Sequence, residues 1–197
     1  MPQDRTRKIV VAAIMAAIAI FLGLTRWGFI PWFGGISLTI MHVPAIIGAI
    51  LEGPLVGVAI GLIFGIFSMI QAAVAPNGPA DTWFTNPLLS VLPRLFIGPV
   101  AWLVWIALQR VPVVGLLAAG AAGSLINTVL VLGMIGLLGY LPWEAILPIA
   151  VANGLPEVAI SAVIVLVVVA AWTPSERITV KMATNSAARP WFRIKVC

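Results

Sequence analysis

The sequence predicts an all-α integral membrane protein, a six-transmembrane-helix bundle with both termini in the cytoplasm. Hydrophobic residues make up 62% of the 197 positions and charged residues only 9%, and the mean hydropathy is +1.15. A helix needs about 20 apolar residues to cross the hydrocarbon core of a bilayer, and several charge-poor runs approach or exceed that length. These runs lack the alternation of polar and apolar residues that a transmembrane β-barrel requires, which favours helices.

Six apolar runs are expected to cross the membrane. In chain order they cover residues 9–24, 37–51, 54–74, 88–108, 113–140 and 143–172. The second run is the weakest candidate, because its 15 residues rise only about 22 Å as a straight helix. The third run carries Gly57, Gly61 and Gly65 at a spacing typical of close helix contacts, and packing within the same chain is the favoured use of that face.

The distribution of Lys and Arg indicates which side of the membrane each end occupies, because cations are retained in short cytoplasmic loops. Arg7 and Lys8 precede the first run, and Arg110 lies between the fourth and the fifth. More cations follow the sixth run, so we expect residues 1–175 to form the membrane domain and residues 176–197 a basic cytoplasmic tail. The net charge of +5 then suits the lipid bilayer with its anionic headgroups and requires no nucleic acid partner.

Polar side chains inside the last two runs are the strongest candidates for a functional site, because such groups are costly at membrane depth. Asn127 lies about 20 Å from the outer end of the fifth run. Asn153 and Glu157 lie about 15 Å and 21 Å from the start of the sixth run, and they share a helix face because they are four residues apart. The three side chains are expected to converge on a bound substrate.

Arg94 lies inside the fourth run, and Asn86, Ser90 and Arg94 at positions i, i+4 and i+8 predict one polar helix face in contact with the substrate. An arginine at this depth can hold a carboxylate or a phosphate through two parallel hydrogen bonds. The alternative is an internal salt bridge between Arg94 and Glu157. The residues alone leave both possibilities open.

Trp83 and His42 complete the candidate substrate-binding residues. Trp83 lies in an outer loop, where aromatic side chains either form an interfacial belt or cover a ligand site. His42, the one histidine of the chain, either forms a hydrogen bond inside the bundle or contacts the ligand. One histidine and one cysteine, Cys197, provide no recognisable set of metal ligands, so no metal is expected.

Three classes of function compete: a substrate-binding subunit, an autonomous secondary transporter of a small organic solute, and an intramembrane enzyme. The chain has no GxxxxGK[ST] loop, so it is not expected to hydrolyse ATP itself. It also shows no convincing internal repeat of the kind common in secondary transporters. Glu157 lacks a paired acid, a nucleophile or a metal set, so no catalytic residue is assigned. A binding subunit is favoured, with the secondary transporter as the alternative.

Four segments, taken in their order along the chain, carry a resemblance to a known family. They are SLTIMHVPAIIGAILEGPLVGVAIGLIFGIFS (37–68), FTNPLLSVLPRLFIGP (84–99), SLINTVLVLG (124–133) and NGLPEVAIS (153–161). The pattern resembles the substrate-binding S components of energy-coupling factor (ECF) vitamin importers, in the branch with pantothenate, pyridoxine, folate and riboflavin carriers. The resemblance implies a multi-pass protein of the prokaryotic plasma membrane that captures a water-soluble vitamin and delivers it to a transmembrane coupling subunit with two ATPase subunits.

The resemblance also implies that the chain itself binds no cofactor and that the partner subunits use ATP. In this family, small alanines of the first helix dock on the coupling subunit. Here Ala12 with Ala16, or Ala13 with Ala17, match that AxxxA pattern in two registers. Arg94 favours a carboxylate-bearing vitamin such as pantothenate, while pyridoxine, folate, riboflavin and thiamine precursors stay open.

Overall fold

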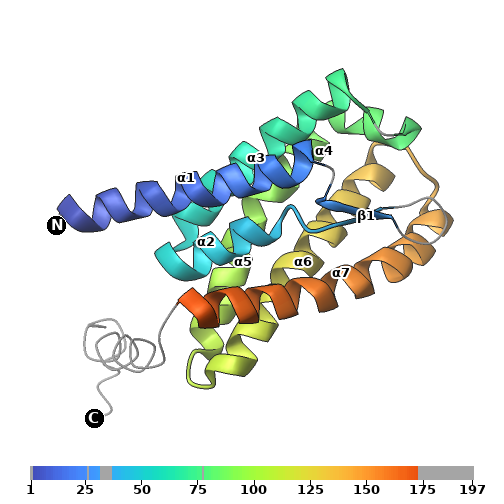
Figure 1. Cartoon of the computed structure of the whole chain (residues 1–197). Helices are drawn as coiled ribbons and strands as arrows, with labels where there is room; N and C mark the ends of the chain where they lie inside the picture. The colour runs from blue at the N-terminus through green and yellow to red at the C-terminus, as the bar shows by residue number, and fades with distance from the viewer. Residues whose placement is uncertain (1, 26, 32–36, 77, 173–197) are drawn as a thin grey trace, which may run out of the picture.

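The computed structural model describes residues 2–25, 27–31, 37–76 and 78–172. In this part of the chain, seven α-helices form one bundle together with a short antiparallel hairpin and a 3-10 helix (Figure 1). The elements are α1 (Pro2–Leu24), β1 (Phe29–Pro31), β2 (Ser37–Thr39), α2 (Val43–Glu52), α3 (Pro54–Val74), η2 (Pro79–Thr85), α4 (Pro87–Ser90), α5 (Leu92–Leu108), α6 (Pro112–Leu137) and α7 (Trp143–Trp172). The predicted helical class is confirmed, with the hairpin as a small exception.

Among the residues that the structure describes, five helical segments are long and apolar enough to cross a membrane. They are Arg5–Leu24, Pro54–Val74, Pro87–Leu108, Pro112–Leu137 and Trp143–Trp172, which match five of the six predicted runs. The remaining helix, α2, is apolar but has only ten residues, which rise about 15 Å. The predicted count of six spanning helices is therefore not reproduced by long helices alone.

The predicted second span is wrong in its first part. Residues 37–39 form β2, which pairs antiparallel with β1 so that Phe29 lies opposite Thr39, and the helix begins only at Val43. The apolar composition of residues 37–51 suits a buried strand as well as a helix, so the run gave no sign of the change. Pairing in a hairpin satisfies backbone groups that an irregular segment inside the bundle would leave unpaired.

The predicted fourth span is divided at Val91 into α4 and α5. Pro93 has no N–H and cannot donate a hydrogen bond to the carbonyl of Leu89, four residues earlier. The Nη1 of Arg94 donates to that carbonyl instead. The arginine thus satisfies a backbone acceptor that the proline leaves open, in an environment where water is not available to do so.

Small residues bring α3 and α5 into close contact. A Cβ placed on Gly57 would lie 2.8 Å from the Cα of Gly98, and one placed on Gly65 would lie 2.8 Å from the carbonyl oxygen of Ser90. Gly61 lies against the backbone of Arg94 in the same way. The prediction that this glycine series packs within the chain is confirmed, and the contact fixes Arg94 beside α3.

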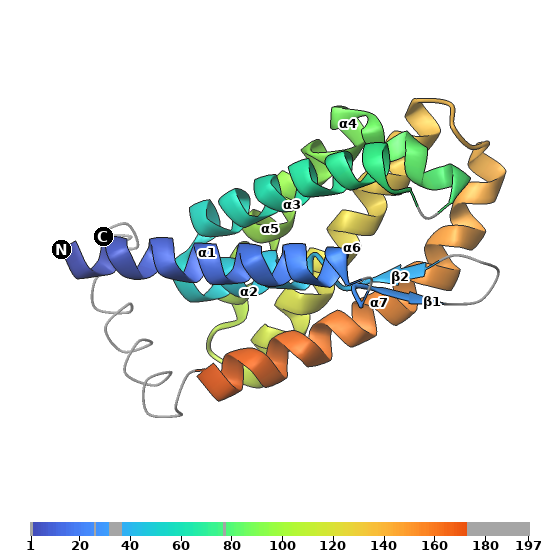
Figure 2. The same cartoon turned by 45° about the horizontal axis from the view of Figure 1, so that its top comes forward.

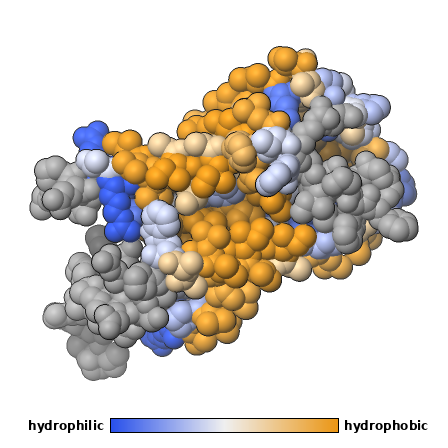
Figure 3. Space-filling view, viewed as in Figure 1, coloured by the Kyte–Doolittle hydropathy of each residue, from blue (hydrophilic) through white to orange (hydrophobic). Residues whose placement is uncertain are grey.

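Apolar side chains cover the outside of the bundle, as a lipid-facing surface requires (Figure 3). Phe21 on α1, Leu103 on α5 and Val167 on α7 are examples of such exposed residues. α1 begins and α7 ends at the same end of the bundle, and the hairpin lies toward the opposite end (Figure 1 and Figure 2). The predicted basic tail, residues 176–197, lies outside the described residues.

Candidate functional site

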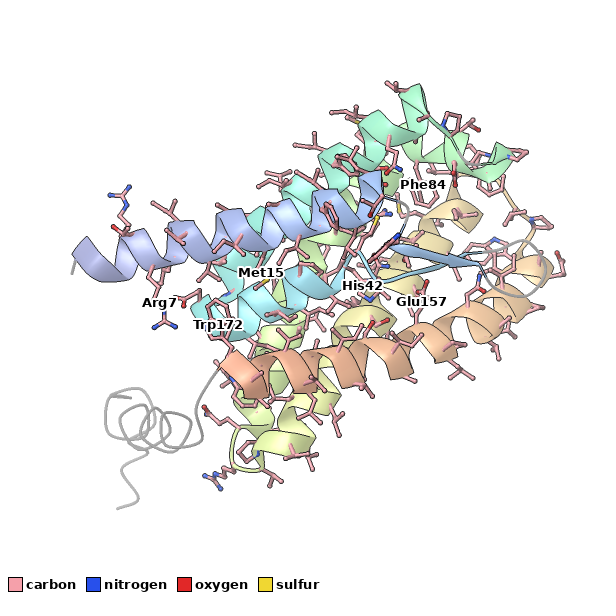
Figure 4. The ribbon with its side chains drawn as sticks, in the orientation of Figure 1. Arg7, Met15, His42, Phe84, Glu157 and Trp172 are labelled. Atoms are coloured by element: carbon pink, nitrogen blue, oxygen red, sulfur yellow. The ribbon has the colours of Figure 1, made fainter. Side chains whose placement is uncertain are left out.

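Glu157 lies in a buried polar cluster between α7, α6 and the hairpin, and Figure 4 shows its side chain together with that of His42 inside the bundle. Its Oε1 accepts a hydrogen bond of 2.7 Å from the N–H of Thr39, and the Thr39 hydroxyl lies 3.3 Å from the same oxygen. Its Oε2 lies 3.4 Å from the hydroxyl of Thr128 on α6. The hairpin and two helices are therefore joined through one carboxylate.

The polar face of α7 follows the line along which α6 and α7 pack. Asn153, Glu157 and Ser161 stand on successive turns of α7, are buried, and span about 12 Å. Asn127 on α6 is buried as well. Within the described part of the chain, neither the Oδ1 of Asn127 nor that of Asn153 has a hydrogen-bond partner. The three residues that were expected to converge thus lie on two helices that pack against each other. Their contact with a substrate stays a prediction.

Arg94 is buried with 5% of its surface exposed, and no acidic side chain among the described residues forms an ion pair with it. The guanidinium carbon lies 5.4 Å from the centre of the Phe64 ring and 5.1 Å from that of Phe84, while Nη1 donates to the carbonyl of Leu89. Its Nε has no partner among the described residues. Arg94 and Glu157 do not form an ion pair with each other, so the salt bridge left open above is absent from this structure.

The polar helix face predicted for Asn86, Ser90 and Arg94 does not form, because Asn86 precedes α4 and the turn at Val91 interrupts the helix. The side chain of Asn86 caps α4 by accepting a hydrogen bond of 3.0 Å from the N–H of Leu88. The hydroxyl of Ser90 donates to the carbonyl of Phe84. Both side chains are used in local structure, whereas Arg94 keeps a buried donor without a partner among the described residues.

His42 and Trp83 occupy positions in which other protein groups are their partners. His42 is fully buried, and its Nε2 lies 2.9 Å from the hydroxyl of Ser161, which is the intramolecular alternative considered for it. Trp83 is half-buried in η2 and stacks on Tyr140, with ring centres 5.4 Å apart and planes inclined by 12°. This stack joins the loop between α3 and α4 to the loop between α6 and α7.

The two alanine registers of α1 point in different directions. Ala16 is buried and Ala12 half-buried, on the face that packs into the bundle beside Met15. Ala13 and Ala17 are exposed on the opposite face. Any partner helix that reaches small residues of α1 from outside therefore meets Ala13 and Ala17.

Three residues of the polar cluster were not among the candidates predicted from the sequence. Ser161 continues the four-residue spacing of Asn153 and Glu157, and Thr128 is a polar residue beside Asn127, so both had a signal in the sequence. Thr39 had no such signal in the sequence, because its contact with Glu157 depends on the hairpin, which the apolar composition of residues 37–51 did not predict.

Comparison with known proteins gives a consistent assignment. A family model described as the substrate-specific component of ECF transporters matches residues 7–169. The pantothenic acid transporter PanT of Lactococcus lactis subsp. cremoris is 29% identical over 193 residues, which cover 88% of this chain and 97% of that protein. The pantothenate transporter PanT of Leuconostoc mesenteroides subsp. mesenteroides is 30% identical over 138 residues, 66% of this chain and 68% of that protein.

Proposed function

Since the chain belongs to the family of substrate-specific components of ECF transporters, we propose that it captures pantothenate for uptake driven by ATP hydrolysis in partner subunits. The family is one of multi-pass membrane transport components and not of enzymes. Both relatives are named as transporters of pantothenic acid or pantothenate. Their names support pantothenate as the ligand over pyridoxine, folate, riboflavin and thiamine precursors.

The observation that carries the proposal is the unneutralised charge of Arg94. Moving a cation out of water costs several kcal/mol, and a partner of opposite charge normally offsets this cost. Arg94 has aromatic rings on two sides and a backbone carbonyl as its acceptor, but no carboxylate of the described residues. A ligand with one carboxylate supplies the missing charge, and pantothenate has one.

Partner subunits complete the proposal. The chain has no phosphate-binding loop of the GxxxxGK[ST] type, so the ATP is assigned to two ATPase subunits that act through a transmembrane coupling subunit. The exposed face of α1 with Ala13 and Ala17 is the proposed contact with that coupling subunit, because small residues allow two helices to approach closely in lipid.

Topology follows from the same scheme. We place the hairpin and α2 together as the second of six crossings, with the hairpin end of the bundle outside the cell. Both termini are then cytoplasmic, as the cations near the ends of the chain favour.

Binding of pantothenate to the detergent-purified chain tests the proposal directly. We expect isothermal titration calorimetry to show saturable binding of pantothenate in the absence of ATP and partners, and weak or no binding of pyridoxine and riboflavin. Proteoliposomes that contain the chain alone should not accumulate pantothenate under a sodium or proton gradient. Accumulation under either gradient would instead support the autonomous secondary transporter.

A further inference from the structure

We propose that the ligand lies in one orientation, with its carboxylate at Arg94 and its hydroxyl and amide hydrogens at the contact between α6 and α7. Glu157, Asn127 and Asn153 accept hydrogen bonds from the ligand at that end. This inference deepens the proposed function and rests on it. It assigns Glu157 as the residue that selects for hydroxyl groups, separately from the arginine that selects for the carboxylate.

The hydrogen bonds of Glu157 leave one of its two oxygens open. Oε1 receives both groups of Thr39, the N–H at 2.7 Å and the hydroxyl at 3.3 Å. Oε2 has only the hydroxyl of Thr128, at 3.4 Å, and that hydroxyl lies closer to the carbonyl oxygen of Ser124, at 3.2 Å. A hydroxyl has one proton to donate, so Oε2 retains capacity for a further donor.

Two more acceptors lie on the same pair of helices. The Oδ1 atoms of Asn127 and Asn153 are buried and have no partner among the residues that the structure describes. Buried oxygens without a partner cost about 1–3 kcal/mol each, which a ligand that donates to them would recover. Asn153 stands one turn from Glu157 on α7, and Asn127 precedes Thr128, whose hydroxyl lies 3.4 Å from Glu157, so the same stretches of α6 and α7 carry all three acceptor groups.

The chemistry of pantothenate matches this division. Its acyl half has two hydroxyls and its amide has one N–H, which makes three donors for the two unpartnered amide oxygens and the remaining capacity of Oε2 of Glu157. Its carboxylate is at the other end of the molecule, where it meets the free Nε and the charge of Arg94. The opposite orientation places the carboxylate against Glu157, and two like charges at short distance in a poorly hydrated site repel strongly.

Three ligands and two variants test separately the carboxylate end and the hydroxyl end of the bound ligand. The ligands are D-pantothenate; pantothenol, which has a primary alcohol in place of the carboxylate; and N-(3,3-dimethylbutanoyl)-β-alanine, which keeps the carboxylate and amide but lacks both hydroxyls. Their affinities are measured by calorimetry on the detergent-purified full chain, with displacement titrations for the weaker ligands. Glu157→Gln should weaken pantothenate and pantothenol by about tenfold or more and the hydroxyl-free ligand by less than about threefold.

Arg94→Gln should give the complementary pattern. It should weaken pantothenate and the hydroxyl-free ligand by about tenfold or more and leave pantothenol within about threefold. Glu144→Gln, on the exposed first turn of α7, and Arg110→Gln, in the exposed loop after α5, remove the same charges elsewhere and should change none of the three affinities. Where Glu157→Gln does not fold, Asn153→Ala carries the same expectation with a smaller factor.

The orientation is overturned if Glu157→Gln weakens all three ligands equally, or if Arg94→Gln weakens pantothenol as much as pantothenate. A reversed pattern places the hydroxyls at Arg94 and also overturns it. The proposed function is judged separately, on the unmodified chain. Absence of pantothenate binding to that chain refutes the function before any variant is compared.

Discussion

The substitution Ala17→Trp should strongly reduce uptake while leaving ligand binding intact. Ala17 is exposed on the outer face of α1, so the larger side chain meets lipid in the isolated chain and disturbs no packing. In the assembled transporter, by contrast, the same position is the proposed contact with the coupling subunit. The variant therefore separates substrate capture from docking.

The size of the effect follows from how closely small-residue faces approach. Within this chain, a single Cβ on Gly57 would come within 2.8 Å of the Cα of Gly98, so a helix contact of this type has no room for a side chain. An indole adds on the order of 150–250 Å² of surface to such a contact. Overpacking typically costs about 1–3 kcal/mol, which weakens docking roughly five- to 150-fold.

Uptake of labelled pantothenate by cells and co-purification of the coupling subunit measure docking, and calorimetry on the isolated chain measures capture. The pantothenate affinity of Ala17→Trp should stay within about twofold of the affinity of the unmodified chain. Sites that share no contacts usually influence each other by no more than about 0.5 kcal/mol. Leu103→Trp, which is lipid-facing on α5, is the matched control and should preserve uptake. Ala16→Trp is not a clean test, because Ala16 is 5% exposed and the substitution overpacks the core. Normal uptake by Ala17→Trp would refute the docking assignment.

Two further predictions concern stability in detergent. Gly98→Leu should lower the thermal unfolding temperature sharply or prevent folding, because even a Cβ there would lie 2.6 Å from the Cα of Gly57. Gly133→Leu should be tolerated, because no atom lies within 4 Å of its Cβ position. Equal unfolding temperatures of the two variants would contradict the packing argument. The Nε of Arg7 lies 2.8 Å from Oε1 of Glu52, but the Arg7 side chain is 53% exposed. A double-mutant cycle should therefore give a coupling energy of only about 0–1 kcal/mol that decreases with added salt. A coupling energy that does not depend on salt would refute this account.

Hydropathy predicted the long helices well, because a run such as 143–172 has few polar residues. In lipid, such a run satisfies all its backbone hydrogen bonds by forming a helix. The burial of Asn127, Asn153 and Glu157 was also predictable, because polar side chains in an apolar helix face the interior of a bundle rather than lipid. The bend before α5 had a local signal in Pro93, which removes the donor that Leu89 needs.

Long-range pairing was not readable in the same way. Thr39 and Glu157 are separated by 118 positions, and nothing in either neighbourhood indicates the other. The hairpin was missed because residues 37–39 are as compatible with a helix as with a strand, and the choice depends on β1, a separate part of the chain. The fate of Ser90 likewise depended on the chain path, because its acceptor is the carbonyl of Phe84 in the preceding loop.

The shortness of α2 has a consequence for biosynthesis. Ten residues rise about 15 Å, half the thickness of a bilayer core, so α2 is too short to leave the translocon as an independent span. The short turn to α3 at Gly53, where φ is 105°, favours insertion of α2 and α3 together as one helical hairpin. The hydrogen bond between Thr39 and Glu157 spans 118 positions of the chain, so it can form only after α7 has been synthesised. The polar cluster around Glu157 is thus completed only when α7 joins the bundle.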